Sequence, residues 1–154
     1  MKKISLTQNK YVLVDNEDFD CLNQWEWCLS VDGYAVRSNY PNKNSIIRMH
    51  RFLLNTKKGQ CVDHINENKL DNRRKNIRLC SKAENLRNKG ITKANKSGFK
   101  GVYWEKYTQK WRASIGVDGK DYRLGRFGDI KEAVKAYNKA ALVYHGEFAK
   151  LNTI

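Results

Sequence analysis

The sequence predicts a fold of the α+β class, in which small antiparallel sheets and short helices follow one another along 154 residues. Short β-rich runs are separated by turn-forming residues, which is typical of antiparallel strands. Two segments begin with helix-capping residues, and the second continues with apolar residues at helical spacing. We expect a β-rich N-terminal scaffold over residues 1–55, a strand–loop–strand–helix unit over 56–92, and a three-stranded antiparallel sheet packed on one helix over 97–154.

The N-terminal third consists of short candidate strands joined by turns. Residues 11–14 are β-rich, residues 25–27 alternate between aromatic and polar side chains, and residues 45–49 are a further candidate strand. Asp32–Gly33 is a hairpin turn signal, and residues 50–54 favour a short helix. Nothing in this third has the arrangement of an active site, so we interpret it as a scaffold.

The middle unit differs from the N-terminal third because two short strands are followed by a helix. Residues 61–65 form a short apolar strand that carries Asp63 and His64, and a polar loop leads to a second strand over 76–80. Ser81, with Glu84 three residues later, is a capping-box signature. A helix is therefore expected from that point to about Asn88.

The last unit has three candidate strands over 99–104, 110–117 and 120–127. Asp118–Gly119 joins the last two as a two-residue hairpin turn. Asp129 can cap a helix in which apolar residues recur at helical spacing up to residue 144, and Gly146 follows as a C-terminal signal.

Charge is the strongest compositional signal. Thirty Lys and Arg against sixteen Asp and Glu give a formal net charge of +14, with +1 in residues 1–55, +7 in 56–95 and +6 in 96–154. This distribution predicts a nucleic-acid-binding surface in the last two thirds. No apolar run could cross a membrane and no signal peptide is evident. An apolar content of 40% and 17 aromatic residues exclude a disordered polycation.

The four cysteines do not form a zinc motif. They lack C-x-x-C spacing and a nearby His that would complete a site, so no zinc is expected. Without an export signal we expect reduced thiols rather than disulfides.

Four polar residues of the middle unit could together support phosphodiester chemistry: Asp63, His64, Asn76 and Asn85. A divalent metal held by oxygen ligands can bind a phosphodiester and stabilise its leaving oxygen, and a neutral His beside it can deprotonate water. Asp63 and His64 are adjacent and would point to opposite faces of a regular strand. The strand must therefore end or twist at this pair if both serve one site.

The segments 62–65, 72–78 and 81–88 (VDHI, NRRKNIR and SKAENLRN) resemble the HNH endonucleases of the phage and intron homing type, in the H-N-N subgroup. The resemblance implies a ββα-metal finger over residues 56–92. It implies Asp63 and Asn85 as ligands of Mg²⁺, with Mn²⁺ able to substitute, His64 as general base, and Asn76 as the residue that orients the His ring.

The last unit resembles the ethylene-response-factor type of DNA-binding domain through the segments 97–104, 110–113, 124–127, 132–141 and 146–152. In that family the sheet enters the major groove of DNA. The resemblance implies these DNA-binding residues: Lys100, Tyr103, Trp104, Lys110, Arg112, Arg123 and Arg126. In the middle unit we expect phosphate contacts from Arg73, Arg74, Arg78 and Arg87.

These observations predict a divalent-metal-dependent endonuclease that nicks double-stranded DNA, acts as a monomer and works in the cytoplasm of a bacterial or phage-infected cell. A catalytically silent DNA-binding regulator built on a nuclease scaffold is the alternative. An RNA-binding protein is disfavoured because the last unit lacks the exposed aromatic motif of an RNA-recognition sheet.

Overall fold

A computed structural model describes residues 1–39, 41–92 and 94–154 and confirms the α+β class. The chain forms two compact units, Met1–Lys82 and Ala83–Ile154. The division into three domains stays a prediction. None of the helices in the described part of the chain is long and apolar enough to cross a membrane.

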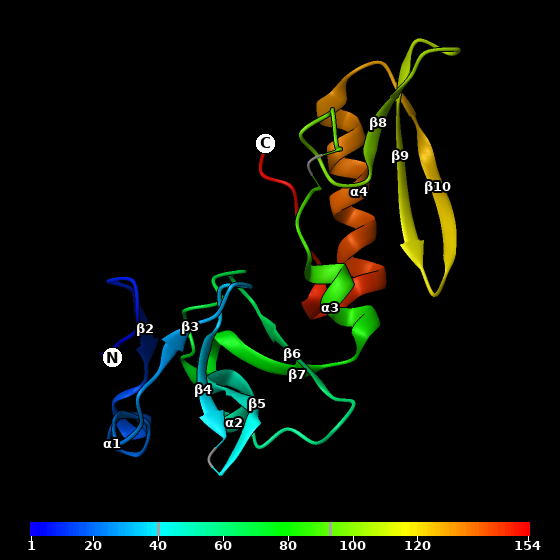
Figure 1. The fold of residues 1–154 in the computed structure, drawn as a ribbon. Helices are drawn as coiled ribbons and strands as arrows, with labels where there is room; N and C mark the ends of the chain where they lie inside the picture. Colours follow the sequence, from blue (N-terminus) through cyan, green and yellow to red (C-terminus); the bar gives the residue numbers. More distant parts are fainter. Residues whose placement is uncertain (40, 93) are drawn as a thin grey trace. The chain divides into compact units, whose positions relative to one another are not determined.

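The first unit is a set of small antiparallel sheets with short helices between them (Figure 1). Its strands are β1 (Lys2–Ser5), β2 (Tyr11–Val14), β3 (Cys28–Leu29), β4 (Ala35–Asn39), β5 (Asn42–Arg48), β6 (Cys61–His64) and β7 (Ile77–Cys80). β1 pairs with β2, β4 lies between β3 and β5, and β6 pairs with β7. The helices are α1 (Asn16–Asn23) and α2 (Met49–Leu53), and a 3-10 turn at Arg74–Asn76 precedes β7.

The core of this unit is formed by apolar side chains of β1, β2 and the two helices. Val12, Val14, Leu22 and Met49 are fully buried. Trp27 also lies in this core, where its indole Nε1 donates to the carbonyl of Leu22 at 2.9 Å. The predicted strand over residues 25–27 is absent: Trp27 turns into the core while Trp25 stays exposed, and β3 begins only at Cys28.

Backbone hydrogen bonds connect β2 to the loop between β6 and β7. The amide of Leu13 donates to the carbonyl of Leu70 at 2.8 Å, and the amide of Asn72 donates to the carbonyl of Leu13 at 2.9 Å. The N-terminal scaffold therefore holds the loop that follows the Asp63–His64 pair.

The second unit confirms the predicted sheet on one helix (Figure 1). β8 (Val102–Glu105), β9 (Lys110–Val117) and β10 (Lys120–Phe127) form an antiparallel sheet in the order β10–β9–β8, and α4 (Ile130–His145) packs on one face. α3 (Lys82–Asn88) begins at the last residue of the first unit, and the rest of this helix belongs to the second.

Glycine is required at two positions of this unit, one in a hairpin turn and one at a close contact with α4. Asp118 and Gly119 both have positive φ, of 49° and 79°, which is the geometry of a type I′ hairpin turn. Gly101 precedes β8 with a φ of 70°, and a Cβ there would lie 2.2 Å from the ring of Tyr137. Only glycine lets this backbone approach α4 so closely.

Candidate active site

Asp63 and His64 lie at the end of β6, opposite β7. In the antiparallel register, Asp63 pairs with Arg78 and His64 pairs with Ile77. Both side chains are buried, with 4% and 6% of their surface exposed. The strand ends at His64, and a turn follows in which the amide of Glu67 donates to the His64 carbonyl at 2.9 Å. Adjacent side chains of a regular strand point to opposite faces, so Asp63 and His64 can serve one site only if the strand ends at this pair. The strand does end there.

Asn72 fixes the orientation of the His64 ring. Nε2 of His64 lies 2.8 Å from Oδ1 of Asn72, whose side chain is fully buried. An amide oxygen only accepts hydrogen bonds, so Nε2 carries the hydrogen and the lone pair of the neutral ring is on Nδ1. The loop between β6 and β7, which carries Asn72, thus selects one tautomer of the imidazole.

The HNH resemblance implied that role for Asn76, but the Asn76 side chain has other partners. The Asn76 side chain donates to the carbonyl of Asp71 at 2.7 Å and accepts from the amide of Asn66 at 3.0 Å. Asn76 therefore closes the loop on itself, and Asn72 contacts the ring. Several asparagines lie in this loop, and sequence spacing alone does not say which one folds back onto His64.

A second histidine packs against the first. The rings of His50 and His64 meet edge to face with their centroids 5.1 Å apart, and Tyr34 lies 4.9 Å from His50 and 6.0 Å from His64. Burial lowers the pKa of His50 to about 3, and it also lowers the pKa of His64. Both imidazoles are therefore neutral at pH 7, which is the form that can accept a proton.

The Asp63 carboxylate is held by Arg78. The Nε and Nη2 groups of Arg78 donate to Oδ2 of Asp63 at 3.0 and 2.9 Å. The described residues contain no group of three His, Cys, Asp or Glu side chains that could hold a metal ion. A single carboxylate with amide oxygens and water suits Mg²⁺, which keeps several of its waters in proteins.

Asn85 is exposed on α3, in the second unit. The positions of the two units relative to one another are not determined. The pairing of Asn85 with Asp63 as metal ligands stays a prediction.

The arginines expected to contact phosphates each have a carboxylate partner within their own unit. Arg73 pairs with Asp71 and Arg74 pairs with Asp18, with closest N–O distances of 2.6 Å in both cases. Hydrogen bonds from Arg73 lower the pKa of Asp71. Arg78 contacts Asp63 as described, and Arg87 contacts Asp118 at 2.9 Å. These pairs orient the guanidinium groups, and their contacts with DNA stay a prediction.

Strand alternation sorts the residues expected to bind DNA in the second unit. Residues that lie opposite one another on paired strands point to the same face of a sheet. On this rule one set of side chains shares the sheet face opposite α4. The set consists of the cross-strand pairs Tyr103–Arg112, Arg112–Arg126, Arg123–Ser114 and Glu105–Lys110. We call this face the open face. Arg112 and Arg126 both pair with Glu105, and hydrogen bonds from Arg126 and Thr108 lower the pKa of Glu105 to about 2.

Trp104 and Lys100 lie elsewhere. Trp104 pairs with Trp111 across the strands, with ring centroids 5.1 Å apart, and Trp111 packs against the core beneath α4. Lys100 precedes β8, and its Nζ donates to backbone carbonyls at the end of α3. Strand alternation therefore places Trp104 on the side of the sheet that faces α4, away from the residues of the open face.

Comparison with known proteins identifies an HNH endonuclease domain within the chain. A family model described as HNH endonuclease matches residues 56–87, which include Asp63, His64, Asn76 and Asn85. Protein 3.8 of Escherichia phage T7 is 36% identical over 93 residues, which cover 60% of this chain and 76% of that protein. Residues 56–87 are therefore an HNH endonuclease domain. The resemblance inferred from the sequence is confirmed for this domain.

A second similar protein comes from a giant virus. The uncharacterized HNH endonuclease L560 of Acanthamoeba polyphaga mimivirus is 28% identical over 150 residues, which cover 94% of this chain and 75% of that protein. No solved structure matches the chain significantly. The HNH endonuclease match of residues 56–87 indicates nuclease activity on DNA.

Proposed function

We propose that the protein is a divalent-metal-dependent endonuclease of the homing type, in the H-N-N subgroup, that nicks double-stranded DNA. The observation that carries the proposal is the His64 ring, which is buried, neutral and held in one tautomer beside the Asp63 carboxylate. The sequence match of Asp63, His64, Asn76 and Asn85 to the family pattern supports the same conclusion.

His64 is the general base in this proposal. Its Nδ1 accepts a proton from a water molecule, whose oxygen attacks phosphorus as the bond to the leaving oxygen breaks. The hydrogen bond from Nε2 to Asn72 keeps the ring oriented and stabilises the positive charge that the ring gains. Asn76 contributes indirectly, since it holds the loop that carries Asn72.

Asp63 and Asn85 would hold Mg²⁺, whose chemistry when bound is to neutralise the phosphate and stabilise the leaving oxygen. Arg78 would then have two roles. Its guanidinium orients the Asp63 carboxylate, and it would also donate hydrogen bonds to the bound phosphate. A carboxylate and an amide oxygen are the hard ligands that Mg²⁺ and Mn²⁺ prefer.

The second unit would dock on DNA as an ethylene-response-factor-type domain through its open face. Lys110, Arg112, Arg123 and Arg126 supply positive charge there, and Arg112 stacks on Tyr103 with its guanidinium 5.1 Å from the ring centroid. Phosphate contacts of this kind position a protein on the duplex. We expect the protein to act as a monomer on DNA inside a bacterial or virus-infected cell.

The Asp63–Arg78 ion pair favours a second candidate function. An arginine that permanently neutralises Asp63 would remove a metal ligand and leave a DNA-binding regulator without catalysis. Metal-dependent cleavage of DNA separates this regulator from the proposed nuclease.

Supercoiled plasmid incubated with the purified protein tests the proposal. We expect nicking with Mg²⁺ or Mn²⁺ and none with EDTA. His64→Ala removes the base but no phosphate contact, so cleavage should fall at least ~100-fold while DNA affinity is retained. Equal cleavage by His64→Ala would refute the assigned role. Binding without any cleavage by the wild-type protein would support the regulator instead.

A further inference from the structure

Lys100 stands out in the second unit because its charge is directed into the protein. Its Nζ donates to the backbone carbonyls of Arg87 and Lys89. These carbonyls lie at the C-terminal end of α3, where a helix leaves its last acceptors without intrahelical donors. A lysine ammonium that satisfies them also interacts favourably with the negative end of the helix dipole.

The backbone of Lys100 is anchored just as firmly. Its amide donates to Oδ1 of Asn152 at 2.7 Å, and its carbonyl accepts from Nδ2 of Asn152 at 3.1 Å. Asn152 exchanges two hydrogen bonds of 2.9 Å with Asn138 of α4. A continuous set of contacts thus leads from α4 through Asn152 and Lys100 to the end of α3.

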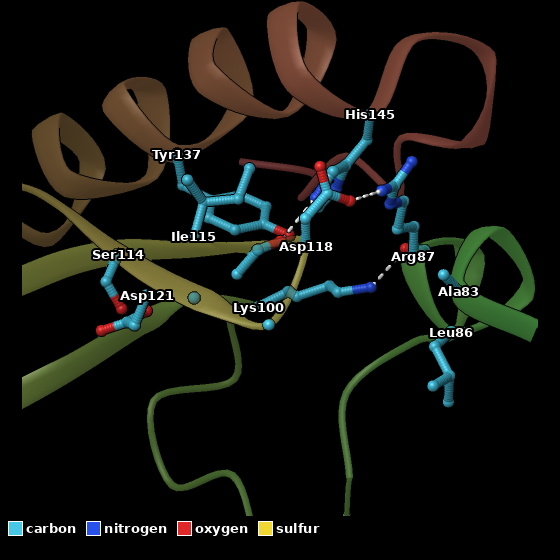
Figure 2. Close-up of a pocket in the computed structure, with 13 residues that line it drawn as sticks. Ala83, Leu86, Arg87, Lys100, Ser114, Ile115, Asp118, Asp121, Tyr137 and His145 are labelled. Atoms are coloured by element: carbon cyan, nitrogen blue, oxygen red, sulfur yellow. Dashed lines mark hydrogen bonds and ion pairs between the residues drawn. The ribbon is translucent and has the colours of Figure 1, made fainter.

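A second link runs from the same helix to the sheet. Arg87 of α3 pairs with Asp118 in the turn between β9 and β10. Figure 2 shows both links around one pocket, with the Lys100 side chain extended toward α3 and Arg87 directed at Asp118. Asp118 is largely exposed, so this ion pair contributes little by itself. Lys100, with two carbonyl acceptors and an anchored backbone, is the stronger link.

α3 is the helix that carries Asn85, the predicted metal ligand. The amide of Lys89 donates to the carbonyl of Asn85 at 3.2 Å, so the turn that Lys100 caps begins at Asn85 itself. We propose that Lys100 is a positioning residue. Its hydrogen bonds hold the C-terminal turn of α3 against the β8–β10 sheet and α4, and they thereby set the orientation of Asn85. This assignment replaces the phosphate contact expected of Lys100 from the sequence, and its catalytic consequence rests on the proposed function.

The test compares Lys100→Met with Lys135→Met in the full-length protein. Lys135 is an exposed residue of α4, so both variants lose one positive charge. We expect Lys100→Met to speed hydrogen exchange of the α3 amides, Lys89 above all, by at least about 10-fold, because two hydrogen bonds to a charged donor are lost. Amides of β9 and β10 should keep their protection. Lys135→Met should change neither.

DNA binding separates positioning from a phosphate contact. With Lys100→Met we expect DNA affinity within about twofold of that of Lys135→Met, and the same salt dependence. Cleavage should fall about 10-fold through kcat rather than KM. Lys100→Arg keeps a cationic donor and should restore the protection of α3, which covers the case in which Lys100→Met unfolds the unit.

The proposal is overturned if Lys100→Met weakens DNA binding, lowers the salt slope by about 1 as a lost phosphate contact would, and leaves α3 exchange unchanged. Loss of α3 protection in a folded Lys100→Arg also overturns it. If the wild-type protein does not cleave DNA at all, the proposed function fails, while exchange and affinity still decide the role of Lys100.

Discussion

Acid should destabilise the first unit through the buried ring of His50. This imidazole is 5% exposed, and among the residues that the structure describes its Nδ1 has no hydrogen-bond partner. Burial is the main cause of its low pKa, and the charges of His64, Arg48 and Arg51 lower it further, against a small opposite effect of Asp32. Asp32 offsets only part of these effects, so a positive charge on the ring is strongly disfavoured.

The size of the effect follows from the two pKa values. The unfolded chain protonates His50 near 6.5, whereas the folded protein does so near 3. Because the unfolded state binds the proton more tightly, stability is full above pH 6.5 and is lost as the pH falls toward 3. Between pH 7 and pH 4 the free energy of unfolding should fall by about 3 kcal/mol from this group alone.

His50→Phe provides the control, since it keeps an aromatic ring against Tyr34 and His64 but cannot titrate. Urea unfolding followed by tryptophan fluorescence at pH 7 and pH 4 measures both proteins. Wild type should lose about 3 kcal/mol more than the variant over this interval, because all other titrating groups, including His64, are shared. Equal losses in the two proteins would show that His50 does not stay neutral in the folded state.

Two further predictions concern DNA. If about six phosphates are neutralised, log affinity should fall against log salt with a slope of roughly −5 in binding titrations, and a slope near zero would contradict docking through the basic units. The chain carries one Asp63–His64 pair, and one such site handles one phosphodiester, so limiting protein should convert supercoiled plasmid to open circles first. Linear product at the earliest times, together with a sedimenting dimer, would contradict a nicking monomer.

The sequence was most informative where the signal is local. The strands 110–117 and 120–127 and the helix ending before Gly146 agree with the structure residue by residue, because turn and cap residues mark their limits. The Asp63–His64 pair at a strand end was also found, since its position depends only on where β6 stops.

Contacts between distant residues were the part that sequence could not supply. Arg74 is a surface cation in the sequence, but in the folded unit its guanidinium lies against Asp18, 56 residues earlier. The choice of Asn72 over Asn76 as partner of His64 depends in the same way on the anchoring of a loop by Leu13. Pairing of this kind is decided by packing, which no spacing rule encodes.

The backbone hydrogen bonds between Leu13 and the loop that carries Asn72 also determine which segment of this protein can be transferred to another protein. A recombination event or a designed fusion that transferred residues 56–92 alone would leave behind the strand that holds Leu70 and Asn72 in place. The transplanted histidine would then have no fixed acceptor for Nε2. A graft of the β6–β7 hairpin onto another DNA-binding protein should therefore include the N-terminal strands that hold its loop.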